Sequence, residues 1–102
     1  MSDTAPSHGE RLVWRYEVYP EAVDAFERAY GSGGDWDRFF DGAPGYEGTE
    51  FYRCVETPDV YITVDYWSKP GQRDFFVASR RREFDVIDAR CEQFTRNELR
   101  LA

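Results

Sequence analysis

The chain has 102 residues, of which 41% are hydrophobic and 18% aromatic, and its formal net charge at pH 7 is -7. This length suits a single domain with one core. The acidic balance argues against a nucleic-acid-binding surface, because such a surface needs clustered positive charge to meet phosphates. The high aromatic share indicates a pocket or an interface in which large rings are gathered.

The first ten residues are polar and include the only histidine, His8. We expect residues 1–10 to form a flexible arm, which argues against a catalytic role for His8, and residues 11–102 to form the domain. No apolar segment has the length of a signal-peptide core or a membrane span, so we expect a cytoplasmic protein with no membrane partner. Cys54 and Cys91 should then remain free thiols. Because no Cys or His spacing is typical of a metal site, we expect no metal and no other cofactor.

Alternating side chains predict strands over Leu12–Tyr19 and Val60–Trp67. Both faces of these strands carry large side chains, whereas a half-exposed antiparallel sheet would alternate between apolar and polar residues. The chain has enough helices to cover one face only. We therefore expect a second copy of the protein to cover the other face, which predicts a homodimer joined through its sheets.

Helical spacing and turn residues define the other elements. They are a helix that begins at Pro20 and ends at Gly31–Gly34, a short helix over Asp35–Asp41, two paired strands within Gly45–Trp67, a long helix from about Gln72 to Phe94 with a bend around Ser79–Arg82, and a final strand or tail over Thr95–Leu101. This order predicts an α+β domain with an antiparallel sheet, the split βαβ arrangement of ferredoxin-like folds.

The connection between the paired strands contains Pro58, whose ring forbids the positive φ of the tightest hairpin turns. A four-residue loop would place Glu50 opposite Asp65, where two like charges repel. A three- or five-residue loop places Phe51 opposite Asp65 and Arg53 diagonal to it. We expect this second register, with Arg53 near Asp65 and Glu50 away from it.

Several short motifs follow this order of elements. They are Pro20-Glu21, Phe26-Glu27, Gly34-Asp35-Trp36, Ala43-Pro44-Gly45-Tyr46 with Gly48-Thr49, Asp65-Tyr66-Trp67-Ser68, and Asp88-Ala89-Arg90-Cys91-Glu92. With these motifs the chain resembles the antibiotic biosynthesis monooxygenase-like family over roughly Leu12 to Leu101. The resemblance implies a dimeric α/β barrel built from two ferredoxin-like domains. It rests on packing and turn residues, and fold alone does not fix a reaction.

Family members include cofactor-independent monooxygenases that oxidise polycyclic aromatic substrates, and haem-degrading enzymes. Resemblance to the first group implies a substrate pocket between helices and sheet, with Trp67 at a strand end and Thr63 where those enzymes carry an asparagine. Resemblance to the second group fails, because the long helix near Phe76 and Val77 lacks the histidine that would bind haem iron.

The first functional hypothesis is a monooxygenase that oxidises an aromatic or phenolic small molecule without metal or flavin. The protein would supply a dry aromatic cavity, a base and a donor for oxyanion charge. Asp65 is the candidate base if burial raises its pKa, and Arg15, Tyr61 or Arg80 is the candidate donor to a substrate oxygen. The alternative for Asp65 is an ion pair with Arg53 or Arg15.

Trp67, Thr63 and Tyr61 are two residues apart along one strand, so they share a face. We expect them to bind substrate at the wall of a cavity between the sheet and the long helix. The alternative for Trp67 is a side chain that fills the core.

A second hypothesis comes from another functional class. The sequence has no usable histidine, reactive cysteine motif or glycine-rich phosphate loop. The lack of these catalytic motifs favours a non-catalytic module that holds a hydrophobic ligand or assembles with a partner enzyme.

Overall fold

A computed structural model describes residues 9–102, and most of the predicted arm, including His8, lies outside these residues. The boundary of the arm is corrected at Glu10, which is the first residue of a strand and pairs with Trp67. The elements are β1 (Glu10–Val18), η1 (Pro20–Ala22), α1 (Val23–Tyr30), α2 (Asp35–Phe40), β2 (Tyr46–Arg53), β3 (Val60–Trp67), α3 (Gln72–Ser79), α4 (Arg81–Cys91), η2 (Glu92–Phe94) and β4 (Thr95–Arg100).

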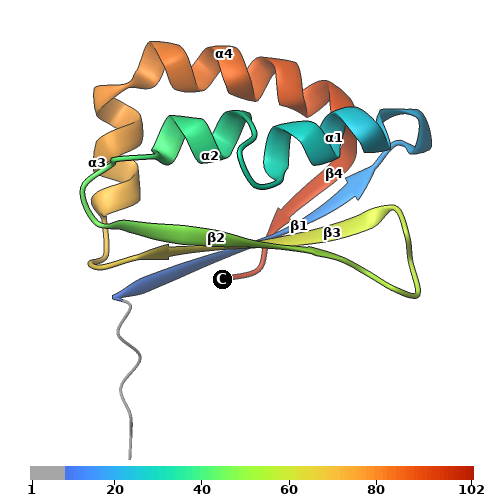
Figure 1. Ribbon diagram of the computed structural model, residues 1–102, viewed down its shortest axis with the longest axis horizontal. Coiled ribbons are helices and arrows are strands. Elements are labelled where there is room, and N and C mark those ends of the chain that lie inside the picture. The colour runs from blue at the N-terminus through green and yellow to red at the C-terminus, as the bar shows by residue number, and fades with distance from the viewer. Residues whose placement is uncertain (1–8) are drawn as a thin grey trace, which may run out of the picture.

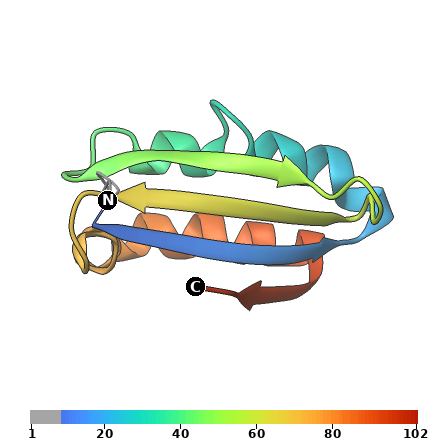
Figure 2. The ribbon, with the colours of Figure 1, turned by 90° about the horizontal axis from the view of Figure 1, so that it is seen from below.

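In this part of the chain, four strands form one sheet in the order β2-β3-β1-β4, and every neighbouring pair is antiparallel. The helices lie together over one face of the sheet (Figure 1). No helix of residues 9–102 lies over the opposite face, which is seen directly in Figure 2. The predicted α+β, ferredoxin-like architecture is therefore confirmed.

The β2–β3 hairpin differs from the expected register. Thr49 lies opposite Asp65, and Arg53 lies opposite Tyr61. The cause is the loop closure, in which Cys54 N–H donates to the Val60 carbonyl and shifts β2 by two residues relative to the expected pairing. The prediction that Arg53 lies near Asp65 is therefore wrong. Glu50 lies opposite Val64, so the expectation that it avoids Asp65 is confirmed.

A β-bulge shifts this register at the start of β2. The pairing shifts by one residue between Tyr46 and Gly48. Gly48 has φ of 113°, a value that side chains disfavour and glycine tolerates. Beyond the bulge, Thr49 lies directly across from Asp65, which brings the two side chains to the same face.

The long helical segment is divided at Arg80, as the sequence predicted. Arg80 has φ of -123° and ψ of 35°, outside the helical range, and its N–H donates to the carbonyls of Phe76 and Val77. The break lets α3 stand at one end of the sheet while α4 runs along it (Figure 1).

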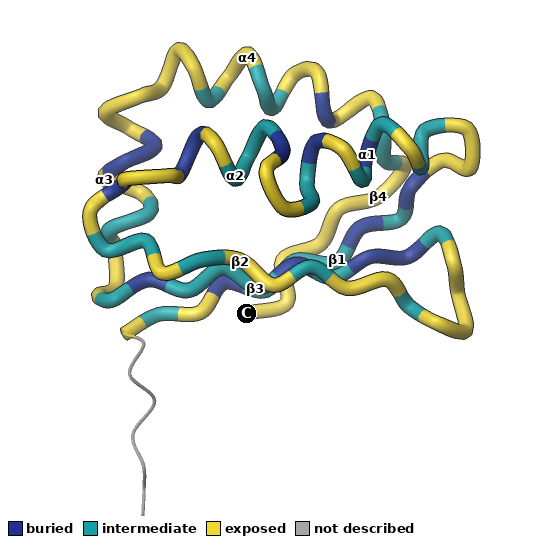
Figure 3. The backbone as a smooth tube through the Cα atoms, viewed as in Figure 1, coloured by how far each residue is buried: buried dark blue, intermediate teal, exposed yellow. Residues whose placement is uncertain are grey.

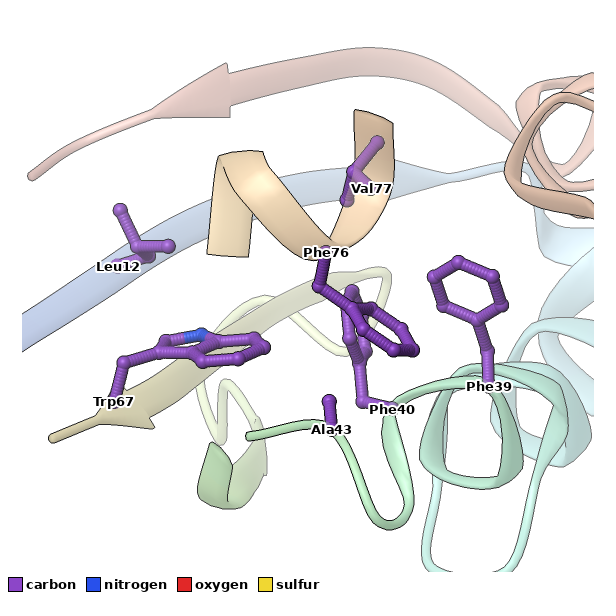
Figure 4. Close-up of a cluster of buried hydrophobic side chains, with 7 residues drawn as sticks. All are labelled: Leu12, Phe39, Phe40, Ala43, Trp67, Phe76 and Val77. Atoms are coloured by element: carbon purple, nitrogen blue, oxygen red, sulfur yellow. The ribbon is translucent and has the colours of Figure 1, made fainter. Parts of the chain in front are cut away.

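Two clusters of buried side chains hold the helices on the sheet, and the buried segments are marked in Figure 3. The first cluster joins α2, α3 and the end of β3 (Figure 4), and contains Leu12, Phe39, Phe40, Ala43, Trp67, Phe76 and Val77. The second joins α1 to β1 and the start of β3, and contains Tyr16, Val18, Phe26 and Tyr61. Space remains between the two clusters.

Candidate functional site

A cavity of about 790 Å³ lies between the inner face of the sheet and the helices. Its volume falls in the range of small-molecule sites. Strands β1, β2, β3 and β4 form its floor, α2, α4 and the end of α1 form its roof, and the start of α3 also contributes to its lining. Seven aromatic side chains line it, namely Trp14, Tyr16, Tyr30, Trp36, Phe40, Phe51 and Phe84. The walls suit a flat aromatic ligand.

Asp65 presents a carboxyl group to this cavity. Thr49 Oγ1 donates a hydrogen bond of 2.7 Å to Asp65 Oδ1, and Tyr46 Oη lies 2.6 Å from the same Thr49 oxygen. Because Thr49 has one hydroxyl proton, Tyr46 must be the donor in its own bond when Asp65 is ionised. The three side chains form a short hydrogen-bonded chain that ends on Asp65.

The electrostatic environment raises the pKa of Asp65 above its ordinary value, because burial disfavours the charged form. The hydrogen bond from Thr49 and the positive charge of Arg73 oppose this effect. A carboxyl group with a raised pKa that faces a cavity is suited to accept a proton from a ligand and to release it again.

Thr63 lies beside Asp65 on the cavity floor. It is only 4% exposed, and its hydroxyl oxygen is 3.4 Å from Tyr16 Oη. Burial raises the pKa of Tyr16, so its hydroxyl stays protonated and is available as a hydrogen-bond donor. The structure thus brings two of the predicted site residues, Asp65 and Thr63, together on one wall.

Trp67 and Tyr61 have other positions. Neither lines the cavity, and both have no exposed surface. Trp67 packs at ring-centroid distances of 5.6 Å from Phe40 and 5.2 Å from Tyr46. The Tyr61 hydroxyl donates to Glu27 at 2.5 Å. The expected position of Trp67 at the cavity wall is therefore corrected, because helices α2 and α3 close over it. A role of either residue in substrate binding stays a prediction.

The two predicted arginines lie apart from the cavity. Arg15 pairs with Ile62 and Leu99 on the opposite face of the sheet, where its guanidinium contacts Glu17 at 2.7 Å. Arg80 is at the α3–α4 break, 5.2 Å above the Phe76 ring and 3.4 Å from Glu83. Neither is among the residues that line the cavity. The proposed ion pair of Asp65 with Arg15 or Arg53 is likewise absent among residues 9–102.

Arg73 and Glu98 are cavity residues that the sequence did not reveal. Partial burial raises the pKa of Glu98, the charge of Asp88 adds to this effect, and Arg73 opposes it. A signal for Glu98 exists in hindsight, because the ferredoxin-like topology pairs the last strand with the first and so places Glu98 opposite Tyr16. No comparable pattern marks Arg73, which lies near the start of α3.

Residues 9–102 contain neither a metal-binding cluster nor a membrane-spanning helix. No group of three or more His, Cys, Asp or Glu side chains could hold a metal ion. No helix has the length and apolar character needed to cross a membrane. Cys54 and Cys91 are free thiols, as predicted, and Cys91 is buried.

Comparison with known proteins gives a clear result for the fold. No protein-family model and no curated protein matches the sequence. A variant of SnoaB from Streptomyces nogalater, described as a cofactor-independent oxygenase, has a TM-score of 0.73 and 16% identity, over 90% of this chain and 89% of that chain.

Two further structures are described as candidate antibiotic biosynthesis monooxygenases. The Nitrosomonas europaea protein has a TM-score of 0.75 and 8% identity, over 96% of this chain and 90% of that chain. The Bordetella bronchiseptica protein has a TM-score of 0.73 and 18% identity, over 88% and 89%. The chain therefore has the fold of antibiotic biosynthesis monooxygenase-like structures, and the resemblance in its sequence is confirmed at the level of the fold.

Proposed function

We propose that this protein is a cofactor-independent monooxygenase that oxidises an aromatic or phenolic small molecule in the cavity. One observation carries the proposal. An aromatic cavity of about 790 Å³ encloses the Asp65 carboxyl group, which has a raised pKa and a fixed hydrogen-bond partner in Thr49. The shared fold with a described cofactor-independent oxygenase supports the reaction class.

In the proposed reaction Asp65 accepts a proton from an acidic C–H or O–H group of the substrate. The resulting carbanion or enolate gives its electrons to molecular oxygen, and a carbon–oxygen bond forms to give a hydroperoxide. Loss of water then leaves a carbonyl group. One oxygen atom stays in the product and the other leaves as water, so a CH₂ group and O₂ become C=O and H₂O. The aromatic walls hold the ring and exclude water.

Oxygen consumption tests this proposal. Dithranol, a dihydroxyanthrone, should be oxidised with uptake of one O₂ per molecule and at a rate above the spontaneous one. Asp65→Asn should lose most of that enhancement, since an amide does not accept the proton. Asp24→Asn is the matched control, because Asp24 is exposed on α1 and does not line this cavity. Binding of dithranol without any enhancement of oxygen uptake would support the non-catalytic binding module instead.

We further propose that two copies associate through the bare face of the sheet. Thr63 and Asp65 face the cavity, so Ile62 and Val64 face the other way. Leu99 belongs to this outer face and is 50% exposed. Apolar side chains gathered around the Arg15–Glu17 pair on an uncovered sheet face are typical of a surface that a partner covers.

Light scattering at micromolar concentration tests the dimer. The wild type should have twice the monomer mass, and Val64→Glu should shift it toward the monomer by adding charge to the outer face. Val55→Glu is the control, because Val55 is 93% exposed in the hairpin loop. A monomeric wild type would contradict the proposal.

A further inference from the structure

We propose that Arg73 is the anchoring residue of the cavity, and that it binds the oxygen of an acidic hydroxyl group on an aromatic ligand that carries no carboxylate. The inference rests on the proposed function for its ligand class and replaces the donors Arg15, Tyr61 and Arg80 expected from the sequence. It places the ligand oxygen beside a cavity residue near the start of α3, the helix that stands at one end of the sheet.

The first argument is an unused donor. The Arg73 side chain is 19% exposed, and its Nε is buried with no hydrogen-bond partner among residues 9–102. Its ion pair is with the adjacent Asp74, at 3.5 Å, and the Asp74 side chain is 84% exposed. A buried N–H without a partner is unfavourable, so the protein's own groups leave hydrogen-bonding capacity unused on a side chain that lines the cavity.

The second argument is the placement of charge. Burial raises the pKa values of Tyr16, Asp65 and Glu98, which come from β1, β3 and β4, and the charge of Arg73 opposes each of these increases. Within the described residues, however, Arg73 forms no ion pair within 4.0 Å with Asp65 or Glu98. The guanidinium group therefore lies near the acidic floor without closing onto it, which leaves room for a ligand oxygen between them.

The third argument concerns the ligand's charge. The cavity is lined by more acidic than basic side chains. Its carboxyl groups are those of Asp37, Asp65, Asp88 and Glu98, and its guanidinium groups are those of Arg73 and Arg100. A permanently anionic ligand would be repelled by this excess of acidic groups. A neutral phenol or enol can enter, and Arg73 can then stabilise its oxyanion as the proton leaves.

Arg81 is a matched control for Arg73, because both side chains contact Phe84. The Arg73 guanidinium carbon is 5.8 Å from the centre of the Phe84 ring, and the Arg81 guanidinium carbon is 5.5 Å from the same ring. Both arginines thus make the same cation–π contact. Only Arg73 lines the cavity, so a comparison of the two separates ligand anchoring from packing on Phe84.

Ionisation of a bound coloured phenol tests the anchor. We would titrate 4-nitro-1-naphthol by absorbance in the presence of each protein. Its bound pKa should be lower in the wild type than in Arg73→Met, and its ionised form should bind Arg73→Met at least tenfold more weakly. Arg81→Met should match the wild type. Arg73→Lys should give a smaller change in the same direction, and it carries the test if Arg73→Met does not fold. Equal pKa values in the wild type and a folded Arg73 variant would overturn the proposal.

A second measurement tests the ligand class. At pH 7, 2-naphthol should bind the wild type at least tenfold more tightly than 2-naphthoate does. Tighter, Arg73-dependent binding of the naphthoate would overturn the assignment of a hydroxyl ligand. These binding measurements are independent of oxygen uptake. If the probe shows Arg73-dependent ionisation but dithranol is not oxidised, the proposed reaction fails and the anchor stands. If dithranol is oxidised and Arg73→Met leaves the probe unchanged, the anchor fails and the reaction stands.

Discussion

The two ends of β3 differ from its middle on the helix-covered face. Tyr61 and Trp67 at the ends have no exposed surface and each belongs to an aromatic cluster. Thr63 and Asp65 between them line the cavity. All four side chains point the same way from one strand, so the difference arises from side-chain size and from what the helices place above them. Large rings at both ends hold the helices on the sheet, and small polar residues between them leave space.

The largest expected effect is at a packed end. Trp67→Ala should lower the free energy of unfolding by roughly 3 to 5 kcal/mol, because it removes a fully buried indole and leaves a cavity beneath α2 and α3. Chemical denaturation measures this loss. Trp14→Ala is the control, since Trp14 is only half-buried and lines the existing cavity, and its loss should be clearly smaller. Similar losses for the two variants would mean that the ends and the middle are equally packed.

At the other end of β3, the substitution of Tyr61 should cause a smaller loss of stability. Tyr61→Phe keeps the ring and removes the hydrogen bond to Glu27, so we expect a loss of about 1 kcal/mol at neutral pH. Burial and the bond to Glu27 raise the pKa of Tyr61 to about 12, from 10.0. The folded state thus retains a proton that the unfolded state loses, and stability falls as the pH rises from 10 toward 12.

Denaturation at several pH values checks this expectation. The difference between the wild type and Tyr61→Phe should shrink across pH 10 to 12, whereas Tyr19→Phe, at an exposed tyrosine, should change little at neutral pH. A difference that grows in this pH range would contradict the assigned bond.

In the middle of β3 we expect a substitution to increase the stability of the folded state. Because the folded-state pKa of Asp65 is raised above 3.8, the ionised carboxylate destabilises the folded state at neutral pH. Asp65→Asn should therefore be slightly more stable than the wild type at pH 7, and this gain should vanish as the pH falls through the folded-state pKa toward 3.8. Urea denaturation over this range, with Asp24→Asn as control, measures it. A loss of stability in Asp65→Asn at pH 7 would indicate a packed, partnered carboxylate like those of ordinary core ion pairs.

The smallest effect is expected at the partner of Asp65. Thr49→Val removes the hydroxyl that donates to the carboxylate, so the pKa of Asp65 should rise further, with little change in stability. Thr49→Ser keeps the hydroxyl and should restore the wild-type pKa. Carboxyl ¹³C chemical shifts, followed during an acid titration, report this value directly. An unchanged pKa in Thr49→Val would mean that Thr49 does not control the group.

Sequence patterns predicted the fold well because the relevant signals are local. Alternation located β1 and β3, and turn residues located the element boundaries. The bend near Arg80 followed from the imperfect apolar stripe of the long helix. The prediction of the pairing between β2 and β3 was wrong, because the closure between Cys54 and Val60 sets their register, and the bulge at Gly48 shifts it at the start of β2.

The site was harder to predict than the fold. Asp65 and Thr63 could be placed on one face by alternation alone, and the cavity contains both. The same alternation included Trp67 and Tyr61, since a strand pattern identifies a face and does not identify where helices close upon it. Arg15 was predicted to bind substrate as well. It lies between Trp14 and Tyr16, the β1 residues that line the cavity, so its side chain is on the opposite face of the sheet. Arg73 lines the cavity because α3 stands at one end of the sheet, an arrangement that no local sequence pattern marks.

The order of the strands also bears on fibril formation. β2 and β4 are the two edges of the sheet, where unpaired backbone groups could add further strands from other molecules. The bulge at Glu47 and Gly48 interrupts the regular ladder of β2 near its start. Exposed charged residues follow both edges, with Glu50 and Arg53 on β2 and Arg96 and Arg100 on β4. Edge-to-edge growth into amyloid is therefore disfavoured, even though the sheet face that carries Ile62, Val64 and Leu99 has no helix of residues 9–102 over it.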